Sequence, residues 1–371
     1  MRIGYFLILM ILFGNIFGYQ GVAQNPLKLK LNYEETGTSA DTSVLIKKLD
    51  DVFQNRFDQG FFEKTIHLAA DRSVSAEEMA KLFGTINKIS ASPILLPLEI
   101  KNPVVRPKPN PLTLLVYAGT EDSLPFNNGI EIDFIGEISE NNSGFPPDKN
   151  AIAVAVDKNG AYLMDGKPFS ATALKTAITS RLKTKSKNKK IIFVRAENYG
   201  NMEDVATIAK SAGAVKIFFV TKNTVYNENG ITFSLSPAFI KDKDVQQMDG
   251  FTTFNFKRSD SGGFEINLQD ELFSKEKADD QLYIEYETRK NDAEVSTPEI
   301  DGSLGVFSIS NEDGFYDAKW MGARKKDGKY QLVIIYFSCT DNQEKNVKLC
   351  QDRANYSRSE FLQILKSIKF K

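Results

Sequence analysis

The chain has 371 residues, more than one domain usually contains, so we expect two or three packed units. Its 47 basic and 48 acidic residues give a formal net charge of -1, and the pI is near 6.1. Because no basic excess is available to neutralise a phosphate backbone, the composition argues against nucleic acid as a partner.

Residues 1–23 have the pattern of a secretory signal peptide. Arg2 precedes an apolar run that Asn15 interrupts, and the small residues that a signal peptidase reads end at Ala23. Because the run is shorter than the roughly 20 residues that span a bilayer, we expect cleavage and a periplasmic or secreted protein. The alternative that the sequence leaves open is a membrane anchor formed by residues 3–18.

Residues 25–100 show the patterns of an α/β unit. A leading strand, LKLKLNY, precedes an apolar helix at 44–57, and a strand, a helix and a further strand follow within 64–100. His67, the single histidine, lies in the apolar pattern TIHLAA with no second histidine or cysteine nearby. This setting favours a buried sheet residue over a metal ligand.

Residues 101–150 predict a linker with additional strands. The prolines of KNPVVRPKPNP remove backbone donors and favour extended geometry. The stretches LTLLVYAG and GIEIDFIGEI have the pattern of strands, and we expect them to extend the sheet of the unit that follows.

Residues 151–229 predict the order β-β-α-β-α-β. The strands AIAVAV and AYLM are joined by an Asn-Gly turn, and an Asp-Gly-Lys-Pro turn leads to a helix that Ser170 caps. The strand IIFVRA, a helix in which Asp204 reaches back as in a capping box, and the strand VKIFFVT complete the unit. One apolar stripe on each helix predicts a sheet covered by both helices on a single face.

This unit resembles the periplasmic domain of the ExbD/TolR biopolymer-transport family over residues 151–221. The resemblance implies a dimer-forming domain that reaches a peptide segment of an energy-transducing partner or the cell wall. It also implies a membrane helix with an acidic residue in a proton path, whereas residues 1–23 contain no Asp or Glu. We therefore expect the family's binding fold without its motor. The resemblance rests on Asp157, Asn159-Gly160, Asp165-Gly166, Arg195-Ala196-Glu197, Gly213-Ala214, Lys216 and Val220-Thr221.

A weaker copy of the same pattern precedes this unit. Residues 64–100 align with 190–221, with Asp71 facing Glu197, once a three-residue insertion is allowed. We interpret residues 25–100 as a degenerate ExbD/TolR-like module that lacks the second hairpin strand; chance similarity between two α/β stretches is the alternative. A true repeat would hold in one chain what the family assembles from two.

Residues 230–371 change to alternating strands and predict a β-rich domain. We expect strands at ITFSLS, FTTFNFKR, GFEINLQ, QLYIEYETR and SLGVFSIS, and a long hairpin with Asp327-Gly328 at its tip. An amphipathic helix with a capping box of Ser357 and Glu360 ends the chain, and its closing ILKSIKF resembles small α/β sandwich domains of the PsbP-like kind. The predicted fold is therefore α+β: two ExbD/TolR-like ββαβαβ modules, the first degenerate, and a β-rich domain with a C-terminal helix.

The sequence contains no recognisable catalytic motif. Nucleophile-elbow, zinc-protease, P-loop and dinucleotide-binding patterns are all missing. The carboxylate pairs Glu77-Glu78 and Glu203-Asp204 open predicted helices, where the helix dipole stabilises negative charge. The lysines of 183–190 are typical of a solvated loop. We predict no enzymatic activity, no cofactor and no metal.

The strand VKIFFVT carries the candidate partner-binding residues. Ile217 and Phe219 are expected to face the helices, which leaves Lys216, Phe218 and Val220 on the other side. At an open sheet edge, these residues would form an adhesive site for an extended peptide or a second copy. The alternative is that the neighbouring domain covers Phe218.

Two further sets of residues are candidates. Cys339 and Cys350 form a candidate disulfide in an oxidising compartment, the alternative being two reduced thiols. Trp320, the single tryptophan, is a candidate glycan contact, the alternative being core packing.

These patterns together predict an exported, non-enzymatic adaptor or binding protein of the cell envelope. Its expected partner is an envelope protein or extended peptide bound by strand addition, with self-association as a further possibility. The alternative function is binding of peptidoglycan or another glycan.

Overall fold

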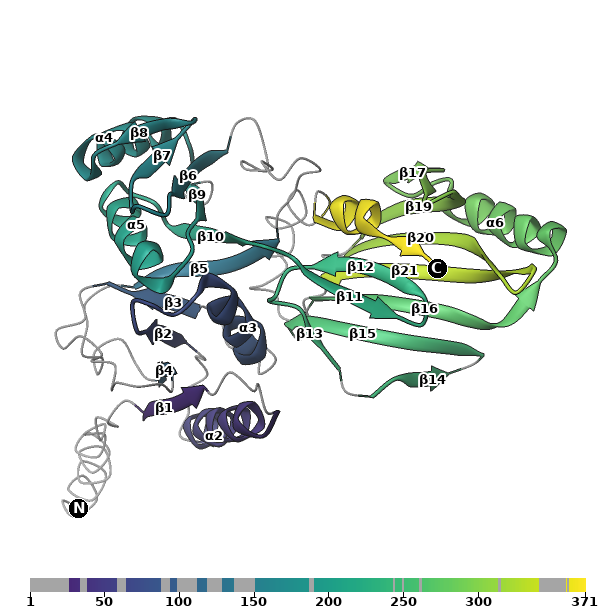
Figure 1. Ribbon diagram of the computed structural model, residues 1–371, viewed down its shortest axis with the longest axis horizontal. Coiled ribbons are helices and arrows are strands. Elements are labelled where there is room, and N and C mark those ends of the chain that lie inside the picture. The colour runs from purple at the N-terminus through teal and green to yellow at the C-terminus, as the bar shows by residue number, and fades with distance from the viewer. Residues whose placement is uncertain are drawn as a thin grey trace, which may run out of the picture.

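The computed structural model describes residues 27–33, 39–58, 65–87, 94–98, 112–118, 129–136, 151–186, 190–242, 244–248, 250–259, 262–312, 315–339, 358 and 360–371. The chain has an α+β fold with a ten-stranded, a nine-stranded and a three-stranded sheet. Figure 1 shows the first sheet in the amino-terminal half and the other two in the carboxyl-terminal half. No helix among these residues is both long and apolar enough to cross a membrane. The predicted signal peptide lies outside the described residues.

The ten-stranded sheet runs in the order β1-β4-β2-β3-β5-β10-β9-β6-β7-β8. Neighbouring strands are parallel from β5 to β6 and between β2 and β3, whereas β5 is antiparallel to β3. Strand β5 therefore joins two blocks of strands that point in opposite directions. The strands are β1 (Leu27–Tyr33), β2 (Ile66–Ala70), β3 (Ile94–Pro97), β4 (Leu112–Ala118), β5 (Gly129–Gly136), β6 (Ile152–Val156), β7 (Tyr162–Met164), β8 (Lys167–Phe169), β9 (Ile191–Arg195) and β10 (Lys216–Thr221).

The two blocks repeat the same order of elements along the chain. The first contains β1, α2 (Ser39–Asp58), β2, α3 (Ala76–Asn87) and β3, and the second contains β6, α4 (Ala171–Leu182), β9, α5 (Tyr199–Ser211) and β10. In the second block β6 pairs directly with β9, and the hairpin strands β7 and β8 are added beyond it. In the first block β4 lies between β1 and β2 instead.

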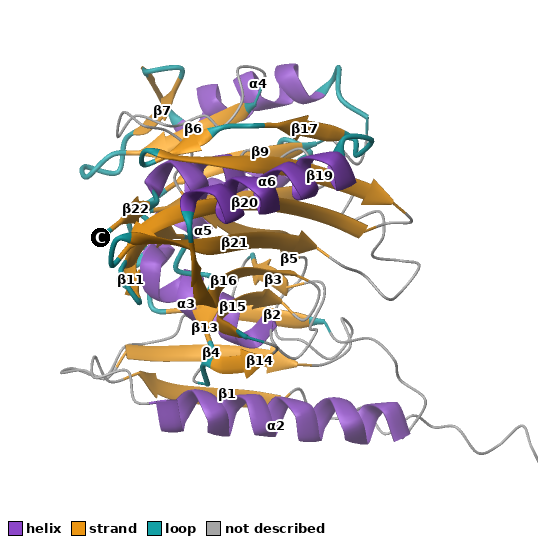
Figure 2. Cartoon of the chain, turned by 90° about the vertical axis from the view of Figure 1, so that its right-hand side faces the viewer, coloured by secondary structure: helices purple, strands orange, loops and turns teal. Residues whose placement is uncertain are grey.

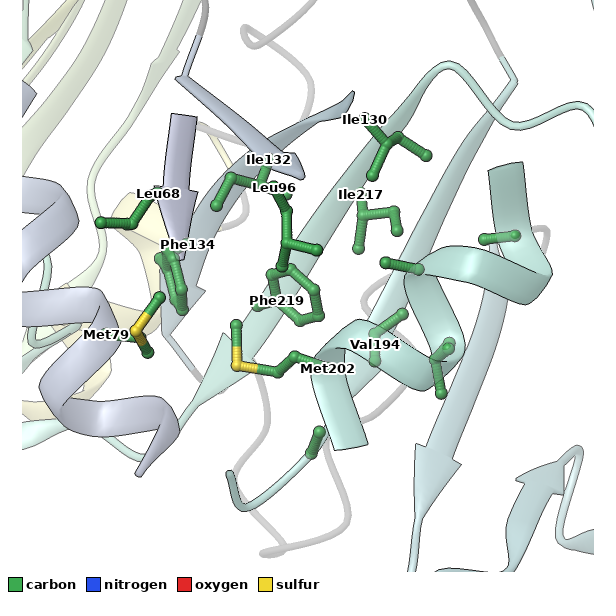
Figure 3. Packing of buried hydrophobic residues seen from close by; sticks show 14 of the residues in the cluster. Leu68, Met79, Leu96, Ile130, Ile132, Phe134, Val194, Met202, Ile217 and Phe219 are labelled. Carbon is green, nitrogen blue, oxygen red and sulfur yellow. The ribbon is translucent and has the colours of Figure 1, made fainter. Parts of the chain in front are cut away.

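One apolar core lies between this sheet and its helices. The cluster takes side chains from α2, α3, α4 and α5, so all four helices cover the same face, as the apolar stripes predict for the second block. Figure 3 shows Met79 of α3 and Met202 of α5 approaching Phe134 and Phe219 of the central strands. The two blocks are therefore not separate domains but share one core.

The loops that precede α3 and α5 pair with each other across the two blocks. The amide of Ala76 donates to the carbonyl of Glu197 at 2.9 Å, and the amide of Tyr199 donates to Val74 at 2.7 Å. These bonds satisfy helix-start amides that would otherwise lack partners. The two blocks are thus joined by backbone hydrogen bonds as well as by the sheet.

An arginine strengthens this junction. The guanidinium of Arg72, from the first block, forms ion pairs with two carboxylates of the second block. Its Nη1 is 2.8 Å from Oε2 of Glu203, and its Nη2 is 2.6 Å from Oδ2 of Asp204. The predicted capping role of Asp204 is wrong, because α5 is capped by Asn198, whose side chain accepts from the amide of Asn201. Burial raises the pKa of Glu203, and the Arg72 charge partly offsets this effect.

The second block opens with three consecutive antiparallel strands, β6, β7 and β8, whereas the sequence predicts a two-stranded hairpin. Ser170 caps α4 as predicted, since its hydroxyl accepts from Ala173. The segment predicted as an Asp-Gly-Lys-Pro turn is shorter, because Asp165 and Gly166 turn the chain with φ of 52° and 72°. Lys167–Phe169 then returns along β7 as β8.

The carboxyl-terminal half is a β-rich domain. Its nine-stranded sheet runs β13-β15-β16-β21-β20-β19-β17, with β14 beside β15 and β18 beside β19, and the three-stranded sheet runs β11-β12-β22. The elements are β11 (Thr224–Glu228), β12 (Ile231–Leu235), β13 (Ile240–Lys241), β14 (Gln246–Met248), β15 (Phe251–Ser259), β16 (Gly262–Phe273), α6 (Lys275–Arg289), β17 (Glu294–Ser296), β18 (Glu299–Ile300), β19 (Ser303–Glu312), β20 (Phe315–Lys326), β21 (Lys329–Cys339) and β22 (Lys369–Phe370).

The start of this domain differs from the sequence prediction. Strands β11 and β12 form one hairpin around Asn229 and Gly230, so a boundary between 151–229 and 230–371 would cut through it. Residues 229 and 230, on either side of the predicted boundary, instead form a turn that joins two strands of the same sheet.

The stretch QLYIEYETR, predicted as a strand, belongs to helix α6. Ser274 caps this helix, with its hydroxyl accepting from the amide of Lys277 at 3.3 Å. Only Ala278 is fully buried, and Ile284 and Tyr283 are exposed, so the apolar alternation that suggested a strand is not a buried face. Figure 2 shows α6 lying across the strands of the nine-stranded sheet.

Residues 360–367 are helical and pack on the opposite side of that sheet from α6. The predicted apolar face is confirmed, because Phe361, Ile364, Leu365 and Ile368 are all buried in the core of this domain. Ser357, one half of the predicted capping box, lies outside the described residues.

The two halves of the molecule meet at helix α3. This helix packs against β13 and β15, and Ala238 joins the core of the amino-terminal half. Gly84 of α3 approaches the Ala238 carbonyl so closely that a Cβ atom would lie 2.0 Å from its oxygen. Glycine is required here by a close approach rather than by its backbone conformation.

We expect Gly84→Ala to destabilise the protein by about 1–3 kcal/mol, because the added methyl overpacks the contact. In a solvated helix the same change would be stabilising, by up to about 1 kcal/mol. Denaturant unfolding measures the effect, with Asp280→Ala in exposed α6 as the control. Equal or greater stability of Gly84→Ala would show that the contact at Ala238 is not tight.

The buried histidine gives a second prediction. His67 is buried in β2, as expected for a sheet residue, and desolvation lowers its pKa from 6.5 to about 4. The unfolded chain therefore takes up a proton near pH 6.5, while the folded chain does so only near pH 4. Stability should fall by roughly 3 kcal/mol as the pH drops through this window. Unfolding between pH 7 and pH 4 should show this extra loss relative to His67→Gln, and identical pH profiles would contradict it.

Candidate partner-binding edge

Strand β10 does not lie at a sheet edge, so the predicted adhesive site on it is wrong. It pairs with β5 on one side and β9 on the other. Lys216, Phe218 and Val220 are 9%, 3% and 3% exposed. The physical reason is that β5, which joins the two blocks, already fills the edge that the second block alone would leave open.

The two faces of β10 were nevertheless assigned correctly. Ile217 and Phe219 lie in the helix-covered core, whereas Phe218 and Val220 belong to a separate cluster with Phe193. The rings of Phe218 and Phe193 stack at 5.4 Å. Phe218 is thus a buried residue, which is the alternative that the sequence left open.

Lys216 lies at the edge of this second cluster. Its Nζ is 2.7 Å from Oε1 of Glu131 and 3.6 Å from Oδ2 of Asp133, and both residues lie on β5. The same ammonium lies 5.0 Å from the centre of the Phe218 ring. These contacts tie β10 to β5 and give Lys216 a structural role.

Trp320 is not available to a glycan. It is fully buried in the core of the carboxyl-terminal domain and stacks on Phe370 at 6.2 Å. Its ring fills the space beside Gly305 and Gly322, where a Cβ atom would lie 2.5 Å and 2.1 Å from ring carbons. Trp320 therefore packs in the core, which is the alternative to glycan contact that the sequence left open.

The disulfide remains a prediction. Cys339 ends β21, opposite Gly262 of β16 and Tyr316 of β20. Cys350 lies outside the described residues.

Several strands end a sheet with one side unpaired in the described part of the chain. These are β1 and β8 in the ten-stranded sheet, β13 and β17 in the nine-stranded sheet, β11 and β22 in the three-stranded sheet, and the short strands β14 and β18 beside β15 and β19. Strand β11 is the one among them that is longer than three residues and has every side chain described. The edge of β11 is therefore the candidate site.

The turn after β11 determines which of its backbone groups point outward. Asn229 and Gly230 have φ of 47° and 78°, the signature of a two-residue hairpin turn. Such a turn is closed by hydrogen bonds between Glu228 and Ile231. Pairs along an antiparallel ladder alternate, so Tyr226 also bonds to β12, while Val225 and Asn227 direct their N–H and C=O groups away from it.

The bonding of β12 supports this assignment. Ser234 lies opposite Val225 in the register, and its amide donates to the Ser367 hydroxyl at 2.9 Å instead of to β11. No backbone hydrogen bond within the described chain reaches the outward groups of Val225 or Asn227. Both side chains are exposed, that of Val225 by 66%.

Tyr226 holds the strand in place between these two exposed residues. Its ring stacks on Phe233 at 5.7 Å and meets the edge of Phe256 at 4.9 Å, and its hydroxyl donates to the Phe239 carbonyl at 3.4 Å. Burial raises the pKa of this hydroxyl above its ordinary value. The strand is therefore anchored through Tyr226, and no described strand pairs with its outer side.

Glu228 is held as well. Its carboxylate is 2.6 Å from the Lys241 ammonium of β13. The only charge on β11 is thus neutralised within the chain, and the edge presents amide, carbonyl, apolar and carboxamide groups.

These groups are suited to binding rather than to catalysis. Backbone donors and acceptors in a row can pair with an extended chain, whereas catalysis requires a nucleophile, an acid or a base. Among the described residues no three His, Cys, Asp or Glu side chains are placed to hold a metal ion.

Sequence reasoning missed this edge because it treated Asn229-Gly230 as a domain boundary. The signal was present, since an Asn-Gly pair flanked by alternating residues, TVYNE and ITFSL, is typical of a hairpin. That TVYNE would lie at an edge depends on non-local pairing and could not be predicted.

Comparison with known proteins does not identify the chain. No protein-family model and no curated protein match it. A crystal structure from Bacteroides thetaiotaomicron is similar at 12% identity and a TM-score of 0.25, over 40% of this chain and 48% of the other, so the match spans about half of that protein. The Saccharomyces cerevisiae Ran-binding protein Mog1p and a single-site mutant of Mog1 each match at 13% identity and a TM-score of 0.25, over 40% of this chain and 95% and 96% of their own. A TM-score of 0.25 does not establish a shared fold.

The orientation of the β11 backbone can be tested by proline substitution. Val225→Pro and Asn227→Pro should leave the free energy of unfolding nearly unchanged, because each removes an amide that makes no bond within the chain. Thr224→Pro should lower the free energy of unfolding by about 1–3 kcal/mol. The backbone groups of Thr224 point toward β12, so this substitution removes a hydrogen bond between the two strands. Denaturant unfolding of the three variants measures these free energies. If the Val225 and Asn227 variants were the destabilised ones, their backbone groups would point toward β12 and those of Thr224 would point outward.

Proposed function

We propose that the protein is an exported, non-enzymatic adaptor or binding protein of the cell envelope that takes up an extended segment of a partner protein by strand addition at β11. The observation that carries this proposal is the pair of outward-facing backbone positions, Val225 and Asn227, without a partner in the described chain. An added strand would complete their hydrogen bonds.

The cellular setting of the proposal comes from the sequence. The signal-peptide pattern at residues 1–23 favours export, and residues 151–221 resemble the periplasmic part of ExbD/TolR transport systems. The repeated order of elements in the ten-stranded sheet is consistent with two such modules fused in one chain. In this proposal the fused modules form the scaffold, and the binding edge lies immediately after the last strand of the second module.

The chemistry of the edge limits the type of ligand. Main-chain hydrogen bonds supply affinity without regard to sequence, and Val225 and Asn227 supply one apolar and one polar contact. Because Glu228 is already paired with Lys241, no free charge on β11 selects an oppositely charged segment. We expect a ligand of alternating polar and apolar residues in extended form.

The test uses the full mature chain and a displayed library of extended peptides taken from envelope proteins, with affinities of the selected peptides measured by calorimetry. Val225→Pro and Asn227→Pro should each weaken binding by roughly ten-fold or more, because a backbone donor is lost. Val225→Thr, which keeps the amide and the β-branched shape, should bind like the original chain.

Three outcomes would contradict the proposal. Selected peptides could bind equally well to the proline variants, or no peptide could bind at all. The third is that the chain sediments with purified peptidoglycan, unaffected by the proline substitutions, which would favour the glycan-binding alternative.

A further inference from the structure

The exposed edge of β11 lacks the devices that usually keep sheet edges from associating. Natural edge strands are shortened, interrupted by proline or marked with unpaired charges. The other fully described edges follow this rule, because β8 contains Pro168 and β13, β17 and β22 have at most three residues. Strand β11 has five residues, no proline and no lysine.

The geometry points to a second copy of this chain as the occupant of that edge: two β11 strands pair antiparallel across a two-fold axis in the absence of another ligand. The inference rests on the proposed function, since partner segment and second copy use the same edge. It adds that the edge is covered before a partner arrives and that the partner must displace the second copy.

The backbone phases of β11 allow this pairing. An antiparallel register centred on Tyr226 places Val225 of each copy opposite Asn227 of the other. Both positions direct their N–H and C=O groups outward, so each opposed pair can exchange two hydrogen bonds. A register shifted by one residue would oppose outward groups to inward ones and lose these bonds.

The side chains are compatible with the same register. Thr224 of one copy lies opposite Glu228 of the other, so no like charges face each other, and Glu228 is already neutralised by Lys241. The arrangement also covers Val225, whose side chain is 66% exposed in the single chain. An isologous contact of this kind uses one patch twice, which is the commonest way in which soluble proteins form dimers.

Sedimentation of the full mature chain over a range of concentrations tests the inference. We expect a monomer–dimer equilibrium whose dissociation constant rises roughly ten- to a hundred-fold in Val225→Pro and in Asn227→Pro, since each removes a donor from both copies. Val225→Thr should dimerise like the original chain. Ile284→Lys, which alters an exposed aliphatic residue on α6, should also have no effect.

Two results would overturn the second copy as occupant: a chain that stays monomeric up to about 100 μM, or a dimer that the proline substitutions leave unchanged. The failures of the two proposals can be told apart. A monomer whose peptide binding is still weakened by proline retains the proposed function and removes the dimer. A proline-sensitive dimer that binds no extended peptide retains the dimer and removes the proposed function.

Discussion

Strand β5 pairs with β3 on one side and with β10 on the other. This double pairing determines which strand edges remain available to a binding partner. Because β5 bridges the two blocks, they form a single sheet with one helix-covered core. Backbone groups that each block would expose alone are satisfied inside the molecule. Among the described strands, unpaired sides are left at the ends of the sheets and on β14 and β18.

The link between the blocks is reinforced on the helix side. The loops before α3 and α5 exchange backbone hydrogen bonds, and Arg72 pairs with two carboxylates of α5. The second block continues through β10 directly into β11, so this doubly linked sheet leads to the exposed strand. A strand that is already ordered loses little entropy when another chain pairs with it, which favours binding.

Local patterns in the sequence predicted local structure well. Ser170 caps α4, the Asp327-Gly328 turn forms the tip of the long hairpin, and Phe361 and Ile364 face a core. Each of these depends on residues a few positions apart. The error at α6 has the same origin, because the alternation in QLYIEYETR resembles a strand when read without the cap at Ser274.

The candidate site could not be found in this way, because it depends on which strands become neighbours. Alternation in VKIFFVT correctly separated Phe219 from Phe218 but contained no information that β5 would lie beside that strand. In the same way, the pattern around Trp320 did not reveal that two glycines from adjacent strands leave room for its ring. The sequence therefore predicts faces, whereas sheet order decides which edges are free.

Amide hydrogen exchange along β11, measured by NMR at a concentration where sedimentation finds single copies, tests the central claim most directly. The account predicts that the amides of Val225 and Asn227 exchange fast, because they make no bond within the chain, while those of Tyr226 and Glu228 are protected by β12. Equal protection of all four amides would show that the outer edge of β11 is already occupied within the molecule, and would contradict the account.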